Sequence, residues 1–331
     1  MGSPANSTDM AARVVIAGAS GTIGRAVVKE CSKRGFDVVA LVRSAGAAEL
    51  AELHNAQCEV VALDDAQALN GVLARTAPFA VISCIASRSG APDDARRVDY
   101  QANSNLLDAA LAAGTERFVL LSAICVQRPH LAFQKAKLAF EAELASAPII
   151  HTIVRPTAFF KSLSGQVQRV MEGKPFLIFG DGELTRCKPI SDADLARFIV
   201  DCLTDPAARG ATLPIGGPGP AISLKEQGEL IFELAGREPR FRSVPVRMFD
   251  IAARILGLGA RLFGGSGWFA EKAEYARIAK YYATQSMLVL DPETGEYDAG
   301  ATPEYGSDTL RDHYTALIAR ELPDPPTQAT P

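Results

Sequence analysis

The sequence lacks the features that mark several large classes of protein. No apolar run reaches the roughly 18 residues that a membrane-spanning helix needs, so the sequence predicts no membrane span. The 34 lysines and arginines are outnumbered by 38 acidic residues, and the net charge is −4. Because phosphate binding favours a basic surface, this balance argues against nucleic acid as a partner. The residues before the first apolar strand contain no apolar signal-peptide core.

Cysteine and histidine are scarce and widely spaced. The six cysteines form no Cys-x-x-Cys pair, a pattern typical of buried, reduced thiols in a cytosolic protein. The four histidines lie far apart along the chain, so no metal site is predicted.

Strand and helix patterns alternate through the first half of the chain. Apolar runs such as "RVVIA", "DVVALV" and "FVLL" are typical of strands buried on both faces, and helical patterns separate them. This alternation predicts an α/β fold with a Rossmann-type doubly wound parallel sheet. We expect a cofactor-binding domain over residues 11–160 and a smaller mixed substrate-binding part over residues 161–322, packed at the carboxyl ends of the strands. The ends, residues 1–10 and 323–331, are predicted to be disordered.

A glycine-rich turn follows the first predicted strand. The spacing Gly18-x-x-Gly21-x-x-Gly24 opens a predicted helix, where free backbone N–H groups can face an anion. This context predicts a dinucleotide cofactor. The predicted contacts in the turn are Gly18, Ala19, Ser20, Gly21, Thr22, Ile23 and Gly24.

The ends of the next strands indicate which dinucleotide is bound. Arg43 stands near the end of the second strand, where NAD-binding proteins usually carry an acid. A guanidinium there suits the 2′-phosphate of NADPH. Asp64, which ends the predicted third strand, is a candidate acceptor for the adenine amino group. Further predicted cofactor contacts are Ala86, Ser87, Arg88 and Pro156.

The segment "LLSAICVQRPHLAFQKAKLAF" resembles the catalytic region of short-chain dehydrogenases, but with one difference. Ser122 and Lys137 match the serine and lysine of that region, whereas Phe133 stands where such enzymes carry a proton-donating tyrosine. Lys137 interrupts an apolar helix face that also holds Phe133 and Phe140. We therefore predict Lys137 and Ser122 as catalytic, with Lys137 also holding the nicotinamide ribose. Predicted substrate contacts near the sixth strand are Phe133, Thr157, Phe159 and Phe160.

Later motifs carry a closer resemblance. The segments "IVRPTAFFKSLSGQV", "FGDGELTRCKPISDADLA" and "KYYATQSMLVLDPETGEY" are similar to those of NADPH-dependent divinyl chlorophyllide 8-vinyl reductases. The resemblance implies reduction of the 8-vinyl group of a divinyl chlorophyllide or protochlorophyllide, a tetrapyrrole, to ethyl. Lys161, or one of Arg247, Arg254 and Arg261, is then a candidate partner for a substrate propionate. Plant members of this family carry a chloroplast transit peptide, and no such peptide is recognised in this sequence. We therefore expect a bacterial, cytoplasmic enzyme.

The sequence leaves other hypotheses open. A non-catalytic NADP sensor similar to the NmrA-like regulators, or a reductase similar to isoflavone reductases, would also lack the tyrosine. Arg247, Arg254 and Arg261 recur every seven residues beside apolar positions, which fits either a peripheral membrane helix or a helix packed on the domain. The oligomeric state is not indicated.

Overall fold

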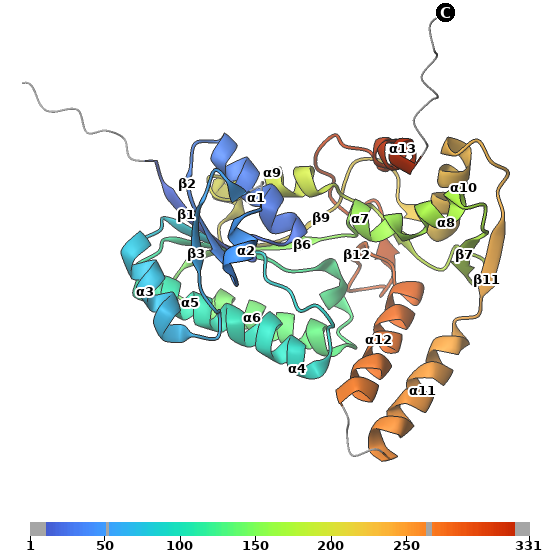
Figure 1. The fold of residues 1–331 in the computed structure, drawn as a ribbon, viewed down its shortest axis with the longest axis horizontal. Coiled ribbons are helices and arrows are strands. Elements are labelled where there is room, and N and C mark those ends of the chain that lie inside the picture. Colours follow the sequence, from blue (N-terminus) through green and yellow to red (C-terminus); the bar gives the residue numbers. More distant parts are fainter. Residues whose placement is uncertain (1–10, 51–52, 263–266, 322–331) are drawn as a thin grey trace, which may run out of the picture.

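The fold is built around one parallel sheet. The structure is a computed structural model that describes residues 11–50, 53–262 and 267–321, so the two predicted disordered ends lie outside the described residues. Seven strands pair in parallel in the order β3-β2-β1-β4-β5-β6-β9 (Figure 1). They are β1 (Arg13–Ala17), β2 (Asp37–Val42), β3 (Gln57–Val60), β4 (Ala80–Ser83), β5 (Arg117–Leu121), β6 (Ile150–Pro156) and β9 (Ala211–Ile215).

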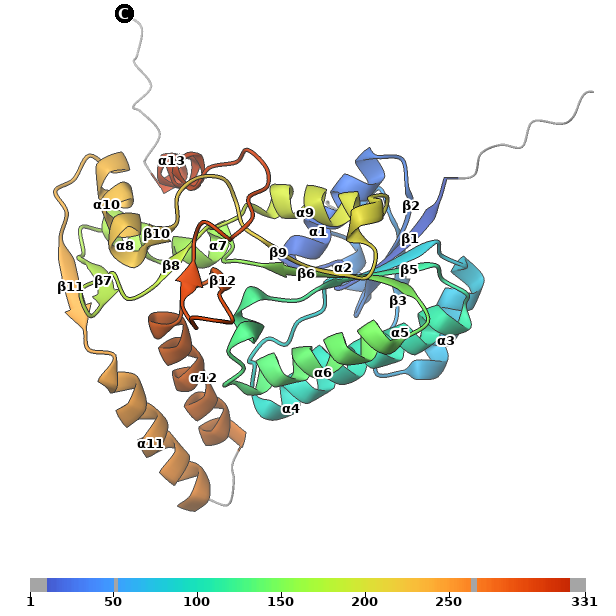
Figure 2. The same ribbon diagram turned by 180° about the vertical axis from the view of Figure 1, so that it is seen from behind.

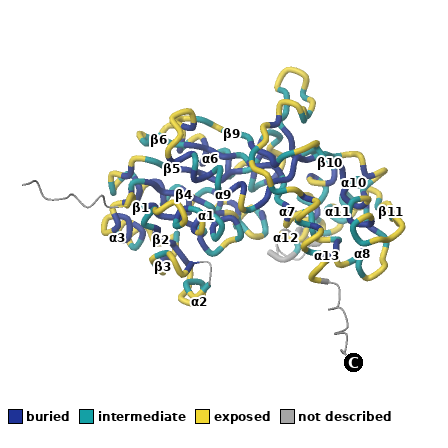
Figure 3. Tube along the Cα trace, turned by 90° about the horizontal axis from the view of Figure 1, so that it is seen from above, coloured by how far each residue is buried: buried dark blue, intermediate teal, exposed yellow. Residues whose placement is uncertain are grey.

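Helices cover both faces of this sheet (Figures 1 and 2). Val27 and Ile199 belong to the apolar core on the face that α1 and α9 cover. Leu73, Leu106 and Phe140 belong to the core on the opposite face, under α3, α5 and α6. Buried residues therefore run along the central strands, as the tube in Figure 3 shows. The helices are α1 (Thr22–Lys33), α3 (Ala66–Thr76), α5 (Ala102–Ala112), α6 (Ala132–Ser146) and α9 (Asp192–Asp201).

The predicted doubly wound parallel sheet is confirmed, and its topology places the site. β1 pairs with β2 on one side and with β4 on the other, so the strand order reverses between β1 and β4. In open parallel sheets, ligands bind at the carboxyl ends of the strands beside such a reversal. Short helices near this edge are α2 (Ala45–Ala48), α4 (Pro92–Asp94), the π-helical turn η2 (Ala95–Gln101) and η3 (Ile124–Gln127).

The second half of the chain both completes the sheet and builds a smaller core. Strand β9 and helix α9 belong to the sheet region, so the sheet crosses the predicted boundary near residue 160. The smaller core gathers Phe176, Phe232 and Tyr314. Its surroundings contain α7 (Phe160–Leu163), η4 (Ser164–Gln166), α8 (Val167–Met171), β7 (Phe176–Phe179), β8 (Arg186–Cys187), η5 (Pro206–Ala208), β10 (Ile222–Ser223), α10 (Leu224–Leu234), β11 (Phe241–Val244), β12 (Val289–Leu290), β13 (Tyr297–Asp298) and α13 (Leu310–Glu321).

Two helices form a hairpin that projects from the body of the molecule. α11 (Arg247–Leu262) and α12 (Gly267–Thr284) lie side by side in both ribbon views (Figures 1 and 2). An ion pair of 2.6 Å between Lys280 Nζ and Asp250 Oδ1 joins them. In the described part of the chain, no helix combines the length and the hydropathy of a membrane span. Residues of α12 also line the cavity described below.

Candidate active site

The glycine turn forms a cradle for an anion at the start of α1. Gly18 has a φ of +75°, and a Cβ there would lie 2.6 Å from the Cys84 carbonyl oxygen. A Cβ on Gly24 would lie 2.1 Å from the Gly18 carbonyl oxygen. Because Gly21 caps the helix and has no side chain, no capping oxygen occupies the first N–H groups. The turn therefore fits a pyrophosphate, which would receive those N–H groups.

A cavity of about 710 Å³ opens beside this turn, at the carboxyl ends of the strands. One wall comes from the sheet edge and another from α12, with α6 between them. Most of the lining is apolar, as is usual for sites that bind organic ligands. The predicted residues that border it are Ala86, Ser87, Arg88, Ser122, Phe133, Lys137, Pro156, Thr157 and Phe159.

Lys137 lies at the edge of this cavity in a buried ion pair. It is 8% exposed, and its ammonium nitrogen lies 3.1 Å from Oδ1 of Asp99. Asp99 is 1% exposed, and its Oδ1 also accepts a hydrogen bond of 3.3 Å from the Ser87 N–H. Its Oδ2 has no hydrogen-bond partner among the described residues. The pair holds the ammonium group in place, so Lys137 is no surface lysine reaching for water.

Ser122 directs its hydroxyl away from free space. The hydroxyl donates to the carboxylate of Glu141, which in turn forms an ion pair with Arg155. Glu141 is 4% exposed, so this network lies behind the cavity wall. The Ser122 N–H donates to the Val154 carbonyl, which attaches the end of β5 to β6. Ser122 thus positions the wall, and its predicted catalytic role stays a prediction.

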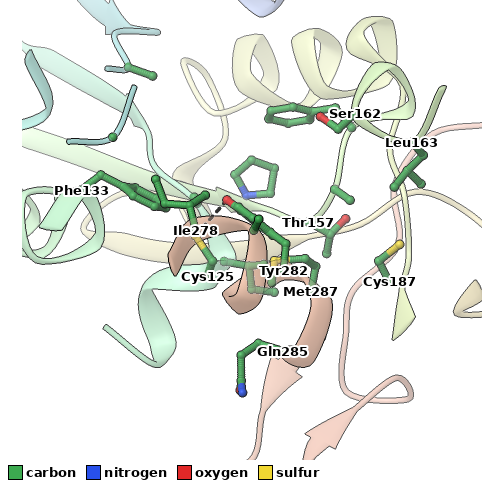
Figure 4. A pocket seen from close by; sticks show the side chains of 18 of the residues that line it. Cys125, Phe133, Thr157, Ser162, Leu163, Cys187, Ile278, Tyr282, Gln285 and Met287 are labelled. Carbon is green, nitrogen blue, oxygen red and sulfur yellow. Dashed lines mark hydrogen bonds between the residues drawn. The ribbon is translucent and has the colours of Figure 1, made fainter. Parts of the chain in front are cut away.

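Two aromatic side chains and a threonine line the substrate side of the cavity (Figure 4). Phe133 packs partly buried against Ile278, while Phe159 borders the cavity close to α7. Thr157 is 5% exposed, and its hydroxyl donates to the Lys188 carbonyl. Its methyl group, by contrast, remains available as an apolar contact. These three positions therefore offer mainly apolar surface to a ligand.

Two predicted substrate residues lie elsewhere. Phe160 is 4% exposed and belongs to the smaller core, where its ring centroid lies 5.3 Å from that of His313. Phe160 therefore lies outside the lining of the cavity, and its predicted contact with the substrate stays a prediction. Lys161 lies instead at the glycine turn, with its ammonium nitrogen 3.0 Å from the Thr22 hydroxyl. It thus faces the phosphate cradle rather than the cavity wall.

Arg43 and Asp64 lie at the same edge of the sheet but beyond the cavity. Arg43 directly follows β2 and is exposed, so its guanidinium is accessible to the 2′-phosphate of a cofactor. Asp64 is also exposed, in a turn that begins after β3 ends at Val60, which is earlier than the sequence predicts. Both positions suit the adenosine end of a dinucleotide whose pyrophosphate lies on the glycine turn.

Sequence reasoning missed several residues that shape the site. Asp99 and Glu141 are buried acids that hold Lys137 and Ser122 in place. Neither pairing can be seen in the sequence, because the partners are far apart along the chain. Tyr282 of α12 and Cys125 of η3 border the cavity from segments far apart in sequence. For Tyr282 the sequence offered one signal, because the residue lies in "KYYATQSM", a part of the segments that carry the family resemblance.

The cysteines at the cavity are poor nucleophiles. Burial raises the pKa of Cys84 and of Cys187 to about 12, and burial is also the main cause that raises the pKa of Cys125. These thiols therefore stay protonated at neutral pH. The arrangement offers a lysine, a phenol and apolar walls, and it suits hydride chemistry better than thiolate chemistry.

Comparison with known proteins agrees with this geometry. Residues 18–206 match the family model described as NAD(P)H-binding. A chloroplastic divinyl chlorophyllide a 8-vinyl-reductase of Oryza sativa subsp. indica is 47% identical over 319 residues, covering 92% of this chain and 78% of that protein. The protein of the same name from Arabidopsis thaliana is 47% identical over 322 residues, covering 92% of this chain and 76% of the relative.

Solved structures support the fold independently. An NADPH-dependent quinone oxidoreductase from Escherichia coli, complexed with NADPH, matches with a TM-score of 0.67. The match covers 92% of this chain and 99% of that chain, at 18% sequence identity. At this identity the likeness shows a shared fold and nothing more. A nicotinamide cofactor is thus supported by the family model, by the glycine turn and by this fold.

Proposed function

The chain belongs to the divinyl chlorophyllide a 8-vinyl-reductase family, and from this premise we propose that it reduces the 8-vinyl group of a divinyl chlorophyllide or protochlorophyllide to ethyl. The 3-vinyl group stays intact, and the reaction serves chlorophyll or bacteriochlorophyll biosynthesis. The observation that carries the proposal within the family is the cavity, which brings Lys137 and the sheet edge against an apolar, aromatic wall. A non-catalytic sensor would not need such a wall.

The residues that would hold the cofactor follow the carboxyl edge of the sheet. When bound, NADPH supplies a hydride to a carbon of the vinyl group. The turn from Gly18 to Gly24 would receive the pyrophosphate, and Arg43 would pair with the 2′-phosphate. Asp64 would accept from the adenine amino group. The nicotinamide end would be held by Ala86, Ser87, Arg88 and Pro156, which border the cavity.

Lys137 is the residue that organises the reacting end. Its ammonium group is held by Asp99 at the cavity edge. There it would donate to the hydroxyls of the nicotinamide ribose, and its charge would stabilise negative charge that develops nearby during the reaction. The proposed role of Lys137 therefore rests on its position and charge.

The chemistry explains why Phe133 replaces the expected tyrosine. A ketoreductase protonates an alkoxide oxygen, and its phenol must lie beside a carbonyl. A vinyl group has no oxygen, so a phenol at that position has no acceptor. Phe133 instead provides an apolar surface at the cavity, beside Ile278.

The substrate's shape suits the other walls. A flat tetrapyrrole needs large apolar contact area, which Phe133, Phe159 and the side chains of α12 supply. The two vinyl groups of the macrocycle react similarly and differ mainly in position on the ring. Selection of the 8-vinyl group therefore depends on how the cavity orients the macrocycle.

The helix hairpin is the candidate contact with a membrane surface. Met248, Ile251, Ile255 and Leu258 share one face of α11 and are between 53% and 67% exposed. Arg247 and Arg254 are exposed along one side of this stripe, whereas the side chain of Arg261 lies outside the described residues. An apolar stripe flanked by arginines suits the interface of an anionic bilayer. We therefore favour peripheral membrane contact over a helix buried on the domain.

The location in the cell stays a prediction. The curated relatives are chloroplastic by name, while the sequence-based expectation for this chain is the bacterial cytoplasm.

Pigment analysis tests the reaction directly. Purified protein is incubated with NADPH and divinyl protochlorophyllide. The product is separated by chromatography, and its mass is determined by mass spectrometry. The expected product gains two hydrogens, and its Soret band shifts to the blue as one vinyl group leaves conjugation. The matched control uses the 8-ethyl pigment, which should not react. Unchanged divinyl pigment with protein that binds NADPH would favour the sensor, and reduction of the 3-vinyl group would contradict the proposed selectivity.

A further inference from the structure

Tyr282 of α12 lines the cavity, where it lies beside Cys125 (Figure 4). Its hydroxyl donates to Cys125 Sγ at 3.9 Å. The residue keeps 46% of its surface accessible and lines the open cavity. A phenol is thus present in the site, although it comes from α12 and not from α6.

The packing of α12 against α6 explains this placement. Ile278 lies one turn before Tyr282 and meets Phe133 at Gly90. A Cβ on Gly90 would lie 2.9 Å from Ile278 Cδ1 and 3.2 Å from Phe133 Cδ1. Ile278, Phe133 and Cys125 belong to one apolar cluster, and Tyr282 contacts the cysteine of that cluster. Tyr282 therefore brings its hydroxyl close to the position where α6 lacks one.

We propose that Tyr282 donates the proton that completes the vinyl reduction, an inference that rests on the function proposed above. Addition of hydride to the terminal vinyl carbon leaves an electron pair on the inner carbon, where the macrocycle spreads the charge. The Tyr282 O–H bond then breaks and a C–H bond forms at that inner carbon. The phenolate takes a proton from water entering the cavity mouth. NADPH is oxidised to NADP⁺, and the pigment gains one hydride and one proton.

The electrostatics of the wall suit a donor. Burial is the main cause that raises the pKa of Tyr282 well above 10, so the phenol keeps its proton at neutral pH. Burial also raises the pKa of Cys125, and the charge of Lys137 opposes that rise. The field of Lys137 thus reaches the thiol that Tyr282 contacts.

The test compares two neighbouring phenols on α12. Tyr282→Phe keeps the ring and removes the donor, so kcat should fall by roughly a hundredfold or more. The KM for NADPH should stay within about twofold, because only a transition-state interaction is lost. The matched control is Tyr281→Phe. The Tyr281 hydroxyl donates to the Cys125 carbonyl at 2.7 Å, and this residue lies outside the described lining of the cavity. Its kcat should stay within about threefold of wild type.

Isotope effects separate proton donation from a structural role. When protonation limits the rate in Tyr282→Phe, the solvent isotope effect on kcat should rise, and the primary effect of 4-deuterated NADPH should shrink. A structural defect would lower kcat without raising the solvent isotope effect or reducing the primary isotope effect. Near-normal kcat in Tyr282→Phe, or equal losses in both variants with unchanged isotope effects, would overturn the inference. Failure of the wild-type protein to reduce the pigment would instead reject the proposed function itself.

Discussion

At the scale of single residues, two buried carboxylates decide what the predicted catalytic side chains do. Asp99 holds the Lys137 ammonium at 3.1 Å, and Glu141 accepts from the Ser122 hydroxyl. The same serine and lysine therefore have different surroundings. Lys137 lies at the cavity edge, whereas the Ser122 hydroxyl points into the cavity wall toward Glu141.

Lys137→Ala should remove most turnover, because the ribose contact and the positive charge at the cavity are lost. We expect kcat to fall by roughly a hundredfold or more. Phe133→Tyr should not raise kcat, since a phenol at that position has no oxygen to protonate. Steady-state kinetics of pigment reduction measures both. Lys135→Ala, an exposed lysine two residues away on α6, is the matched control and should behave like wild type.

Folding must be checked in this experiment. Removing one partner of a buried ion pair costs roughly 3–5 kcal/mol, because Asp99 is left buried and unpaired. The double variant Lys137→Met with Asp99→Asn removes both charges and should recover much of that stability without recovering kcat. Near-normal kcat in either variant would reduce Lys137 to a structural role.

Arg43→Ala should change cofactor preference rather than catalysis. A charge-assisted contact with the 2′-phosphate contributes roughly 1.5–3 kcal/mol, which is about ten- to a hundredfold in affinity. The KM for NADPH should rise by that factor, while the KM for NADH should hardly change. Arg209→Ala, another exposed arginine, serves as the control. Equal losses with both cofactors would assign Arg43 another role.

At the scale of elements, the hairpin of α11 and α12 has two faces with different tasks. The inner face of α12 carries Ile278 and Tyr282 to the cavity. The outer face of α11 exposes Met248, Ile251 and Ile255. An exposed apolar stripe of this kind is typical of a surface that contacts a partner or a membrane, which is the basis of the membrane contact proposed above. The hairpin thus lies between the cavity and the proposed membrane contact.

Vesicle binding tests this element. The protein should sediment with phosphatidylglycerol vesicles at low salt and much less with phosphatidylcholine vesicles, because the arginines need anionic headgroups. Ile251→Ser with Ile255→Ser should weaken binding roughly tenfold or more, since each apolar side chain contributes on the order of 1.5 kcal/mol when buried.

The control for that experiment is Val60→Ser. Val60 is 56% exposed but lies on β3, at the other end of the sheet. It should leave vesicle binding unchanged. Absence of sedimentation with anionic vesicles at low salt would show that α11 is simply an exposed helix of the domain.

At the scale of the whole molecule, the site depends on parts that are distant in sequence. The glycine turn and the strand ends come from the first half, and α12 closes the cavity from the second half. The second half also returns β9 and α9 to the sheet, where α9 packs beside α1. Cofactor side and substrate side are therefore not separate bodies joined by a linker. Their relative placement follows from the return of β9 and α9 to the sheet.

The sequence by itself determined the sheet, the cofactor turn and the family. Period and composition are local, so apolar runs and the glycine spacing carry enough information to predict a parallel sheet and a dinucleotide site. What only the tertiary structure decided are contacts between distant segments. Examples are Asp99 with Lys137, Lys161 with Thr22, and the burial of Phe160. Such contacts depend on how helices rotate and pack against one another. The sequence alone therefore showed a missing phenol at Phe133, and only the tertiary structure brought Tyr282 of α12 to the cavity that Phe133 also lines.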